Sequence, residues 1–302
     1  MSGNGGGRYG AIETGGTKVL CAVGAEDGSI LESERVATRD PTATLADVFA
    51  WFAAAEQRHG ALLGFGVGAF GPVELRRQSA QYGFVTTTPK AGWKYFDLYG
   101  SLSRHFRRPV AFDTDVNAAA LGEIRWGAGR DLQTLAYVTV GTGIGVGIVQ
   151  HGLPVHGLMH PEAGHAVVRK HPEDSAFAGI CPFHGDCLEG LACGPAIQAR
   201  TGRTLLEAAA DDPIWSIEAD YLGQLAALLV LTHSPERILF GGGVMQEPRL
   251  FRQIHARMHD WLRGYMPHPE LSDPGFIRRP GLGDQAGIRG ALVLILRATA
   301  PA

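Results

Sequence analysis

Short apolar runs alternate with amphipathic stretches along the chain. Apolar runs that end at glycine or polar turns are typical of buried strands. They predict strands at residues 9–12, 19–23, 29–36, 62–70, 109–112, 135–140, 146–150 and 237–240. Apolar residues spaced three and four apart predict helices at residues 45–59, 93–104, 217–233, 248–264 and 284–298.

The order of these elements repeats. A hairpin with a glycine-rich turn, followed by helices and single strands, begins near residue 9 and again near residue 135. The interpretation is a duplicated α/β domain with a cleft between its halves. Residues 152–212 have no counterpart in the first half and are interpreted as an insertion. We therefore expect a small lobe of residues 1–116, to which residues 284–302 return, and a large lobe of residues 117–283.

The composition is that of a globular protein with balanced charge. The 302 residues are 45% apolar and 19% charged, with a formal net charge of −3. This balance removes the electrostatic reason to expect nucleic acid or an anionic membrane as a partner. No uninterrupted apolar run reaches the roughly 18–20 residues of a membrane span. Residues 1–7 are polar and glycine-rich, without the pattern of a signal peptide, so we expect a disordered leader on a cytoplasmic protein.

Glycine is unusually abundant, with 42 residues gathered mostly in short clusters. Three clusters follow apolar strands, at residues 15–16, 141–145 and 241–243. Glycine lets backbone N–H groups approach a phosphate, through positive φ and the absence of a Cβ. No segment matches the Walker A pattern, and the second cluster leads into a strand rather than the helix of a Rossmann fingerprint. The clusters therefore indicate either another kind of nucleotide site or simply tight turns.

A carboxylate stands at the end of the strand predicted at residues 109–112, in the sequence Asp113-Thr114-Asp115. Asp115 lies where that strand gives way to a helix, at the mouth of the expected cleft. Phosphoryl transfer to a hydroxyl needs such a group to accept the hydroxyl proton. Aspartate is also a favoured helix N-cap, so the position alone leaves both roles open.

Cysteine and histidine gather in the insertion. The residues with the spacing of zinc ligands are His165, Cys181, His184 and Cys187. The two-residue gaps among the last three suit a tight knuckle, because Pro182 and Gly185 favour turns. Competing donors are His160, His171 and Cys193. The alternative without a metal is a buried cysteine pair beside a surface histidine.

The segment Ile12-Glu13-Thr14-Gly15-Gly16-Thr17-Lys18 resembles the phosphate-1 hairpin of the ROK sugar kinases. Residues 140–145 resemble the phosphate-2 hairpin of that family, and residues 239–244 resemble its adenosine loop. The resemblance implies a two-lobed, duplicated actin/hexokinase-like (ribonuclease H-like) fold that binds ATP with Mg²⁺. The ATP and phosphate contacts it implies are Glu13, Gly15, Gly16, Thr17, Lys18, Gly141, Thr142, Gly143, Gly241, Gly242 and Gly243. The family usually has aspartate at the place of Glu13, a difference that bears on the Mg²⁺ contact.

The same resemblance assigns the remaining candidates. Residues 113–123 are similar to the family's Asn-Asp-x-Asn stretch, which makes Asp115 the general base and Asn117 a sugar or structural contact. The positions that match sugar-binding residues of the family are Glu162, His165 and Glu189. The Cys-x2-His-x2-Cys spacing resembles the zinc motif of the fructokinase branch, and it implies a structural zinc on His165 and the three donors at 181, 184 and 187.

Residues 68–73 and 87–94 also resemble the fructokinase branch. They imply an enzyme that transfers the γ-phosphoryl group of ATP to the 6-hydroxyl of D-fructose. The resemblance to the family as a whole also implies a homodimer. Mannose or glucose is the alternative acceptor, and a non-catalytic sugar-binding or regulatory ROK protein is the alternative function. We do not expect a DNA-binding repressor, because the hairpin at residue 9 leaves no room for an N-terminal helix-turn-helix. A zinc hydrolase is disfavoured because protein donors fill all four metal positions.

Overall fold

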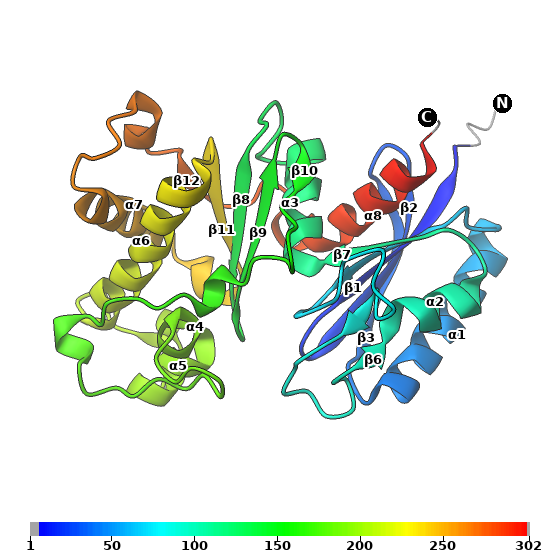
Figure 1. Ribbon diagram of the computed structural model, residues 1–302, viewed down its shortest axis with the longest axis horizontal. Helices are drawn as coiled ribbons and strands as arrows, with labels where there is room; N and C mark the ends of the chain where they lie inside the picture. The colour runs from blue at the N-terminus through cyan, green and yellow to red at the C-terminus, as the bar shows by residue number, and fades with distance from the viewer. Residues whose placement is uncertain (1–5, 301–302) are drawn as a thin grey trace. The chain divides into compact units, whose positions relative to one another are not determined.

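The computed structural model describes residues 6–300, which form two compact units (Figure 1). Unit 1 contains the chain up to Arg130, the segment Leu153–Pro161 and the chain from Asp284 onward, and unit 2 contains Asp131–Gly152 and Glu162–Gly283. The first division thus falls after Arg130, whereas the sequence places it near residue 116, and the expected insertion is shared between the units. Most of the predicted leader, residues 1–7, lies outside the described residues.

Unit 1 is built on a mixed sheet in the order β3-β2-β1-β4-β7. Its strands are β1 (Arg8–Thr14), β2 (Lys18–Ala25), β3 (Ile30–Ala37), β4 (Phe65–Ala69) and β7 (Val110–Thr114). β1, β2 and β3 form antiparallel pairs, whereas β1, β4 and β7 are parallel. The carboxyl ends of the parallel strands therefore meet at one edge of the sheet, where α/β proteins commonly bind ligands.

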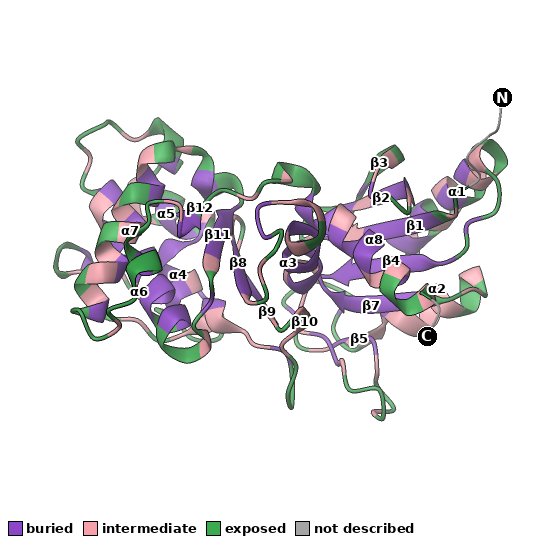
Figure 2. Cartoon of the chain, turned by 90° about the horizontal axis from the view of Figure 1, so that it is seen from above, coloured by how far each residue is buried: buried purple, intermediate pink, exposed green. Residues whose placement is uncertain are grey.

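Helices cover both faces of this sheet. Alternate residues of β1 face opposite sides. Ile12 joins a core with Val48 of α1 (Pro41–His59) and Leu102 of α2 (Leu98–Phe106). Ala11, on the other face, packs with Ile288 of α8 (Ala286–Thr299). Figure 2 shows the resulting run of buried positions along β1, β4 and β7.

The crossing of α3 (Asp115–Trp126) and α8 is unusually close. A Cβ on Gly290 of α8 would overlap the carbonyl of Ala118 in α3, and a Cβ on Gly122 of α3 would lie 2.8 Å from the carbonyl oxygen of Ala286. Glycine at these two positions lets the helix axes approach. The C-terminal helix is in this way held against the helix that begins at Asp115.

The helix predicted at residues 93–104 begins later, at Leu98, because Asp97 caps it by accepting a hydrogen bond from Gly100 N at 2.8 Å. Trp93 belongs to the preceding turn. It is 1% exposed, and its Nε1 donates to the carbonyl of Arg39 at 2.7 Å. Trp93 therefore fits the helical spacing of apolar residues although it is not part of the helix; it is apolar because it is buried by tertiary contacts. The two-residue strands β5 (Phe84–Val85), β6 (Phe96–Asp97) and β10 (Leu153–Pro154) were too short to predict.

Unit 2 repeats the arrangement with strands in the order β9-β8-β11-β12. They are β8 (Leu135–Val140), β9 (Ile144–Gln150), β11 (Arg237–Gly241) and β12 (Ile277–Arg278). β8 and β9 are antiparallel, and β8, β11 and β12 are parallel. The series β9-β8-β11-β12 thus has the order and directions of β2-β1-β4-β7 in unit 1. This match gives the duplication a structural basis that sequence order could only suggest.

The helices of unit 2 are α4 (Leu188–Ala192), α5 (Gly194–Thr201), α6 (Ile214–His233) and α7 (Pro248–Leu262). Short 3-10 turns lie at Ala163–His165, Pro172–Asp174, Leu205–Glu207, Gly243–Gln246 and Pro269–Ser272, and a further one, Gly283–Gln285, spans the point where the chain passes from unit 2 to unit 1. α6 packs against α7 and is long and apolar enough to cross a membrane, but 78% of its apolar window is buried inside the structure. It has the burial expected of a core helix.

Candidate active site and metal centre

The parallel strands of unit 1 place the first glycine turn and Asp115 at the same edge of the sheet. β1 ends at Thr14 and β7 ends at Thr114, and β4 lies between them. Phe70, which follows β4, donates its N–H to Thr14 Oγ1 at 3.0 Å. The turn itself is closed by the bond from Gly15 N to the carbonyl of Lys18 at 2.9 Å. The first contact joins the ends of β1 and β4, and the pairing of Ala69 with Thr114 aligns the end of β7 with β4.

Asp115 is not the N-cap of its helix. Thr114 has that role, because its Oγ1 accepts a hydrogen bond from Asn117 N at 3.1 Å. Asp115 occupies the first helical position, and its Oδ1 accepts the adjacent N–H of Val116, at 2.9 Å. The structural alternative considered for Asp115 therefore does not apply. Its carboxylate is available for chemistry at the start of a helix, where a negative charge is favoured.

Two carboxylates influence each other at this edge. Burial raises the pKa of Asp115 to about 6, against the lowering effect of its backbone hydrogen bonds. Burial and the charge of Asp115 raise the pKa of Glu13 to about 7, although Lys18 opposes the shift. Glu13 packs against α8, since a Cβ on Gly287 would overlap its carboxyl group. A site with partly buried carboxylates in mutual repulsion suits a divalent cation.

A histidine that the sequence did not identify as a candidate lies beside the end of β7. His156 Nε2 is 3.0 Å from Asp113 Oδ2. Asp113 is 3% exposed, and its other oxygen accepts from Asn117 Nδ2 at 2.8 Å and from Thr114 N at 2.7 Å. Asn117 is itself 1% exposed, which favours the structural one of its two predicted roles. No local pattern marks His156, because its partner lies 43 positions earlier in the chain.

The other two glycine clusters meet in unit 2. Gly241 pairs with Thr139 at the carboxyl end of β8, and a Cβ on Gly242 would overlap the carbonyl of Val140. The turn between β8 and β9 therefore lies directly beside residues 241–243. The amide of Gly194, which begins α5, donates to the carbonyl of Gly141 at 2.8 Å. A second set of backbone groups is thus assembled at strand ends.

The reason for glycine differs among these turns. Gly242 has φ of 95°, a conformation that other residues rarely adopt. The glycines at 15, 16, 141 and 143 do not have positive φ, which corrects the general expectation from the sequence. Gly16 and Gly143 instead leave room for side chains: a Cβ would lie 2.9 Å from Lys90 Nζ in the first case and 2.6 Å from Glu189 Oε2 in the second.

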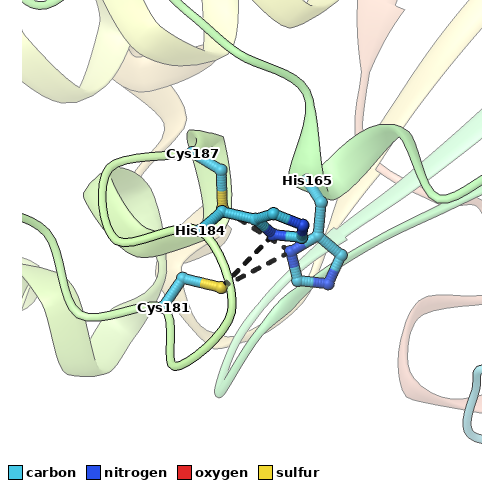
Figure 3. A group of neighbouring side chains, drawn as sticks. All are labelled: His165, Cys181, His184 and Cys187. Carbon is cyan, nitrogen blue, oxygen red and sulfur yellow. Dashed lines mark hydrogen bonds between the residues drawn. The ribbon is translucent and has the colours of Figure 1, made fainter. Parts of the chain in front are cut away.

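The four predicted metal ligands converge in unit 2 (Figure 3). His165, Cys181, His184 and Cys187 each offer a ligand atom, and these atoms all lie within 4.8 Å of one another. Cys181 Sγ is 3.8 Å from His165 Nδ1 and 3.7 Å from His184 Nδ1, and Cys187 Sγ is 3.5 Å from His165 Nδ1. Tetrahedral zinc with ordinary bond lengths would separate sulfur and nitrogen ligands by about 3.6 Å. The donor set fits zinc in type and in spacing.

The knuckle forms for a local reason. Cys181 and Gly185 exchange backbone hydrogen bonds of 3.1 and 2.9 Å, and Gly185 has φ of 64°. The competing donors lie elsewhere in other roles. His160 Nε2 accepts a hydrogen bond from Val73 N at 3.0 Å in unit 1, and Cys193 is a buried residue between α4 and α5. His171 caps the 3-10 turn that follows it.

Glu189 joins this cluster to the glycine turn of unit 2. Its Oε2 accepts a hydrogen bond from Ile144 N at 2.9 Å, and its Oε1 is 3.9 Å from His165 Nε2. Nδ1 of His165 faces the cysteines, so its Nε2 faces the carboxylate. At this distance the two groups are in ion-pair range but do not form a hydrogen bond. Glu162 precedes the 3-10 turn that carries His165, and its carbonyl accepts from His165 N at 2.9 Å.

The duplicated sheets and strand-end glycine turns are typical of the actin/hexokinase fold, and comparison with known proteins identifies the class as sugar kinases. The sequence profile of the ROK family matches residues 9–298. The chain belongs to the ROK family. It is 42% identical over 287 residues to a putative fructokinase of Bacillus subtilis (94% of each chain) and 42% identical over 293 residues to a fructokinase of Zymomonas mobilis (96% of this chain, 97% of the relative).

Solved structures agree with the fold predicted from the sequence. A ROK hexokinase from Thermus thermophilus matches with a TM-score of 0.77 at 27% identity, over 96% of this chain and 99% of the other. A ROK glucokinase from Streptomyces griseus, in complex with glucose and AMPPNP, matches with a TM-score of 0.76 at 27% identity, over 95% and 99%. The predicted α/β fold of the actin/hexokinase type is confirmed.

Proposed function

We propose that this protein is an ATP-dependent fructokinase that transfers the γ-phosphoryl group to the 6-hydroxyl of D-fructose. Fructose is supported because the chain is more similar in sequence to fructokinases than to a glucokinase. Fructokinases from several bacteria are 39–42% identical over 88–96% of the chain, whereas a glucokinase of Halalkalibacterium halodurans is 28% identical over 93%. Mannose and glucose are the alternative acceptors.

The main structural support for the proposal is the position and the raised pKa of Asp115. Thr114 caps the helix in place of Asp115, so the Asp115 carboxylate is not used as a cap. It lies at the same edge of the sheet as the first glycine turn. A base acts best when its pKa is near the working pH, and burial brings the pKa of Asp115 to about 6. At neutral pH it would be mostly ionised and able to take the proton of a bound hydroxyl.

The remaining residues would hold the substrates. In unit 1, the backbone of residues 15–17 and Lys18 would contact phosphate, and Glu13 would hold Mg²⁺, which neutralises charge on the phosphates of bound ATP. In unit 2, the turns at 141–143 and 241–243 would supply the other ATP contacts. Glu162, His165 and Glu189 would bind sugar hydroxyls. Asn117 would keep Asp113 in place rather than touch the sugar.

The Cys and His cluster would hold a structural zinc. The four protein donors would fill the tetrahedral positions of zinc and would leave no open position for a reacting water. The bond from Ile144 N to Glu189 and the proximity of Glu189 to His165 connect this centre to a glycine turn. Zinc would therefore support both the sugar residues and the backbone of residues 141–143.

The most informative experiment measures ADP release with a panel of sugars: fructose, mannose, glucose and N-acetylmannosamine. We expect the highest kcat/KM with fructose and identify the product as fructose 6-phosphate by NMR. A preference for glucose or mannose would replace the proposed acceptor and keep the kinase. An absence of ADP release with every sugar, in a folded protein loaded with zinc, would contradict the kinase itself and leave the non-catalytic alternative.

We also propose that the protein acts as a cytoplasmic homodimer. Support for a dimer comes from exposed apolar side chains in the metal-binding segment, where Val167 is 94% exposed, Phe183 53% and Ile180 38%. A second copy could cover them. Light scattering during gel filtration would give the mass in solution, and a monomer at micromolar concentration would reject this part of the proposal.

A further inference from the structure

Lys90 is a charged residue that the proposed mechanism has not used. It lies in the stretch 87–94, between the short strands β5 and β6 of unit 1. The sequence gives it no chemistry, since it reads as part of a surface turn. In the structure its ammonium group lies over the first glycine turn: a Cβ on Gly16 would be 2.9 Å from Lys90 Nζ and 4.0 Å from its Cε.

The surroundings hold this ammonium group in place without neutralising it. Lys90 Nζ lies 4.5 Å from the centroid of the Phe70 ring, a cation–π contact. Phe70 is anchored by its own N–H on Thr14 and by edge contact with the buried Trp93. Among residues 6–300, Lys90 Nζ forms neither a hydrogen bond nor an ion pair.

Lys90 is also close enough to Asp115 for their charges to interact. Burial lowers the pKa of Lys90, and the Asp115 carboxylate opposes that shift. The interaction is reciprocal, because the charge of Lys90 lowers the pKa of Asp115. The ammonium group thus lies within electrostatic range of both the first glycine turn and the carboxylate that would accept the hydroxyl proton.

We propose that Lys90 is a catalytic residue that contacts the γ-phosphoryl group as it passes from ATP to the sugar. The inference rests on the proposed kinase function and adds a residue to it. The bond between the γ-phosphorus and the oxygen bridging to the β-phosphate breaks, and a bond from the sugar oxygen to that phosphorus forms. The hydroxyl proton goes to Asp115, and ADP leaves with the bridging electron pair. Lys90 stays protonated and stabilises the charge on the equatorial oxygens.

The position of Lys90 suits a phosphate bound at the first glycine turn. The ammonium group occupies the space beside residue 16, where a Cβ would require the end of the lysine side chain to move. An ammonium group that is partly withdrawn from water and lacks a hydrogen-bonded anion favours an anionic ligand. A phosphate bound at residues 15–17 would supply that charge.

The test compares Lys90→Met, which keeps the aliphatic stem against Phe70, with the matched control Lys94→Met. Lys94 belongs to the same turn and also lies over an aromatic ring, 5.6 Å from the centroid of Tyr95, but it is exposed. We expect Lys90→Met to lower kcat by about 100-fold or more, the range for one lost donor to a transition state. Lys94→Met should remain within about twofold of the parent. Lys90→Arg, which restores the charge, should recover at least about tenfold of the loss.

Calorimetric titration with AMP, ADP and AMPPNP gives a readout that does not depend on turnover. We expect Lys90→Met to weaken AMPPNP most, by about tenfold, and to leave AMP within about twofold, because only the terminal phosphate reaches the lysine. Equal weakening of all three nucleotides would indicate a structural role and overturn the proposal. So would a kcat within threefold of that of Lys94→Met.

The two proposals fail in distinguishable ways. If the parent protein phosphorylates no sugar, the kinase function fails, and the nucleotide series still decides whether Lys90 contacts the terminal phosphate. If the parent is active and the kcat of Lys90→Met is within threefold of that of Lys94→Met, the role of Lys90 fails and the kinase stands. Should Lys90→Met melt more than about 5 °C below the parent, Lys90→Gln takes its place in both assays.

Discussion

At the scale of single residues, Asp115 shows how neighbours assign a role. A strand-end aspartate before a helix would ordinarily cap it, but the side chain of Thr114 is the cap, and the carboxylate of Asp115 is half-buried and bonded to adjacent backbone. Sequence reasoning alone left both roles open. The distinction depends on which side chain turns back onto the helix, which neither the residue types nor their spacing specify.

Asp115→Asn should separate activity from stability. We expect kcat to fall by about 1,000-fold or more, while the affinity for AMPPNP changes little. The folded pKa of Asp115, about 6, lies above the ordinary value of 3.8, so the ionised carboxylate destabilises the fold above pH 6. The variant should therefore melt at the same temperature as the parent or a few degrees higher at pH 7.5, as measured by calorimetry. Asp211→Asn, at an exposed aspartate, is the control. Near-normal turnover in Asp115→Asn would refute the role as base.

The pH dependence of kcat/KM for the sugar follows from the same shift, because kcat/KM reports the pKa of a base in the free enzyme. A base must be deprotonated, and the deprotonated fraction of Asp115 falls about tenfold per pH unit below its pKa of about 6. We expect kcat/KM to be nearly constant above pH 7.5 and to decline below about pH 6. The measurement is a steady-state profile from pH 5 to 9, with Lys94→Met as a parallel control for acid stability. A profile that stays flat down to pH 5 would exclude this assignment.

At the scale of elements, close packing between helices gives some residues the opposite of their usual effect. Replacing glycine by alanine inside a helix ordinarily adds about 1 kcal/mol of stability. Gly290 lies in α8 where that helix crosses α3, and a Cβ would overlap the carbonyl of Ala118. The periodic apolar pattern predicts α8 correctly, but it does not show that glycine sets the distance to α3.

Gly290→Ala should lower the free energy of unfolding by about 2 kcal/mol or more, because the helices must separate to admit the methyl group. Denaturant titration followed by circular dichroism measures this. Gly243→Ala is the control for stability, since a Cβ there would meet no atom within 4 Å. If Gly290→Ala proved as stable as the parent, the close crossing of α3 and α8 would be wrong.

At the scale of the whole molecule, the two units should respond differently to loss of metal. The four donors belong to unit 2, and Glu189 connects them to the β8–β9 turn of that unit. Chelation to a verified zinc-free state should lower the melting temperature by roughly 5–10 °C. Hydrogen exchange measured by mass spectrometry should rise at residues 141–145 and 163–193 and stay unchanged across β1 and β2. Unaltered exchange at 163–193 in the zinc-free protein would contradict a structural metal.

The sequence by itself determined what depends on local pattern and spacing. Apolar periodicity predicted the long strands and helices, repetition of their order predicted the duplicated fold, and two-residue gaps predicted the donors at 181, 184 and 187. These features could be predicted because period, turn chemistry and ligand spacing are properties of neighbouring residues. The strands β5, β6, β10 and β12 were missed because two residues do not make a pattern.

Only the tertiary structure decided which distant residues meet. Lys90 lies over Gly16, His156 pairs with Asp113, and Glu189 joins the glycine turn to His165. Each of these contacts joins segments separated by dozens of residues, so its geometry follows from how sheets and helices pack rather than from any local preference. Packing also sets the burial that brings the carboxyl pKa of Asp115 to about 6. The sequence specifies which chemical group each side chain carries. The pKa and the partners of that group depend on its surroundings in the folded protein.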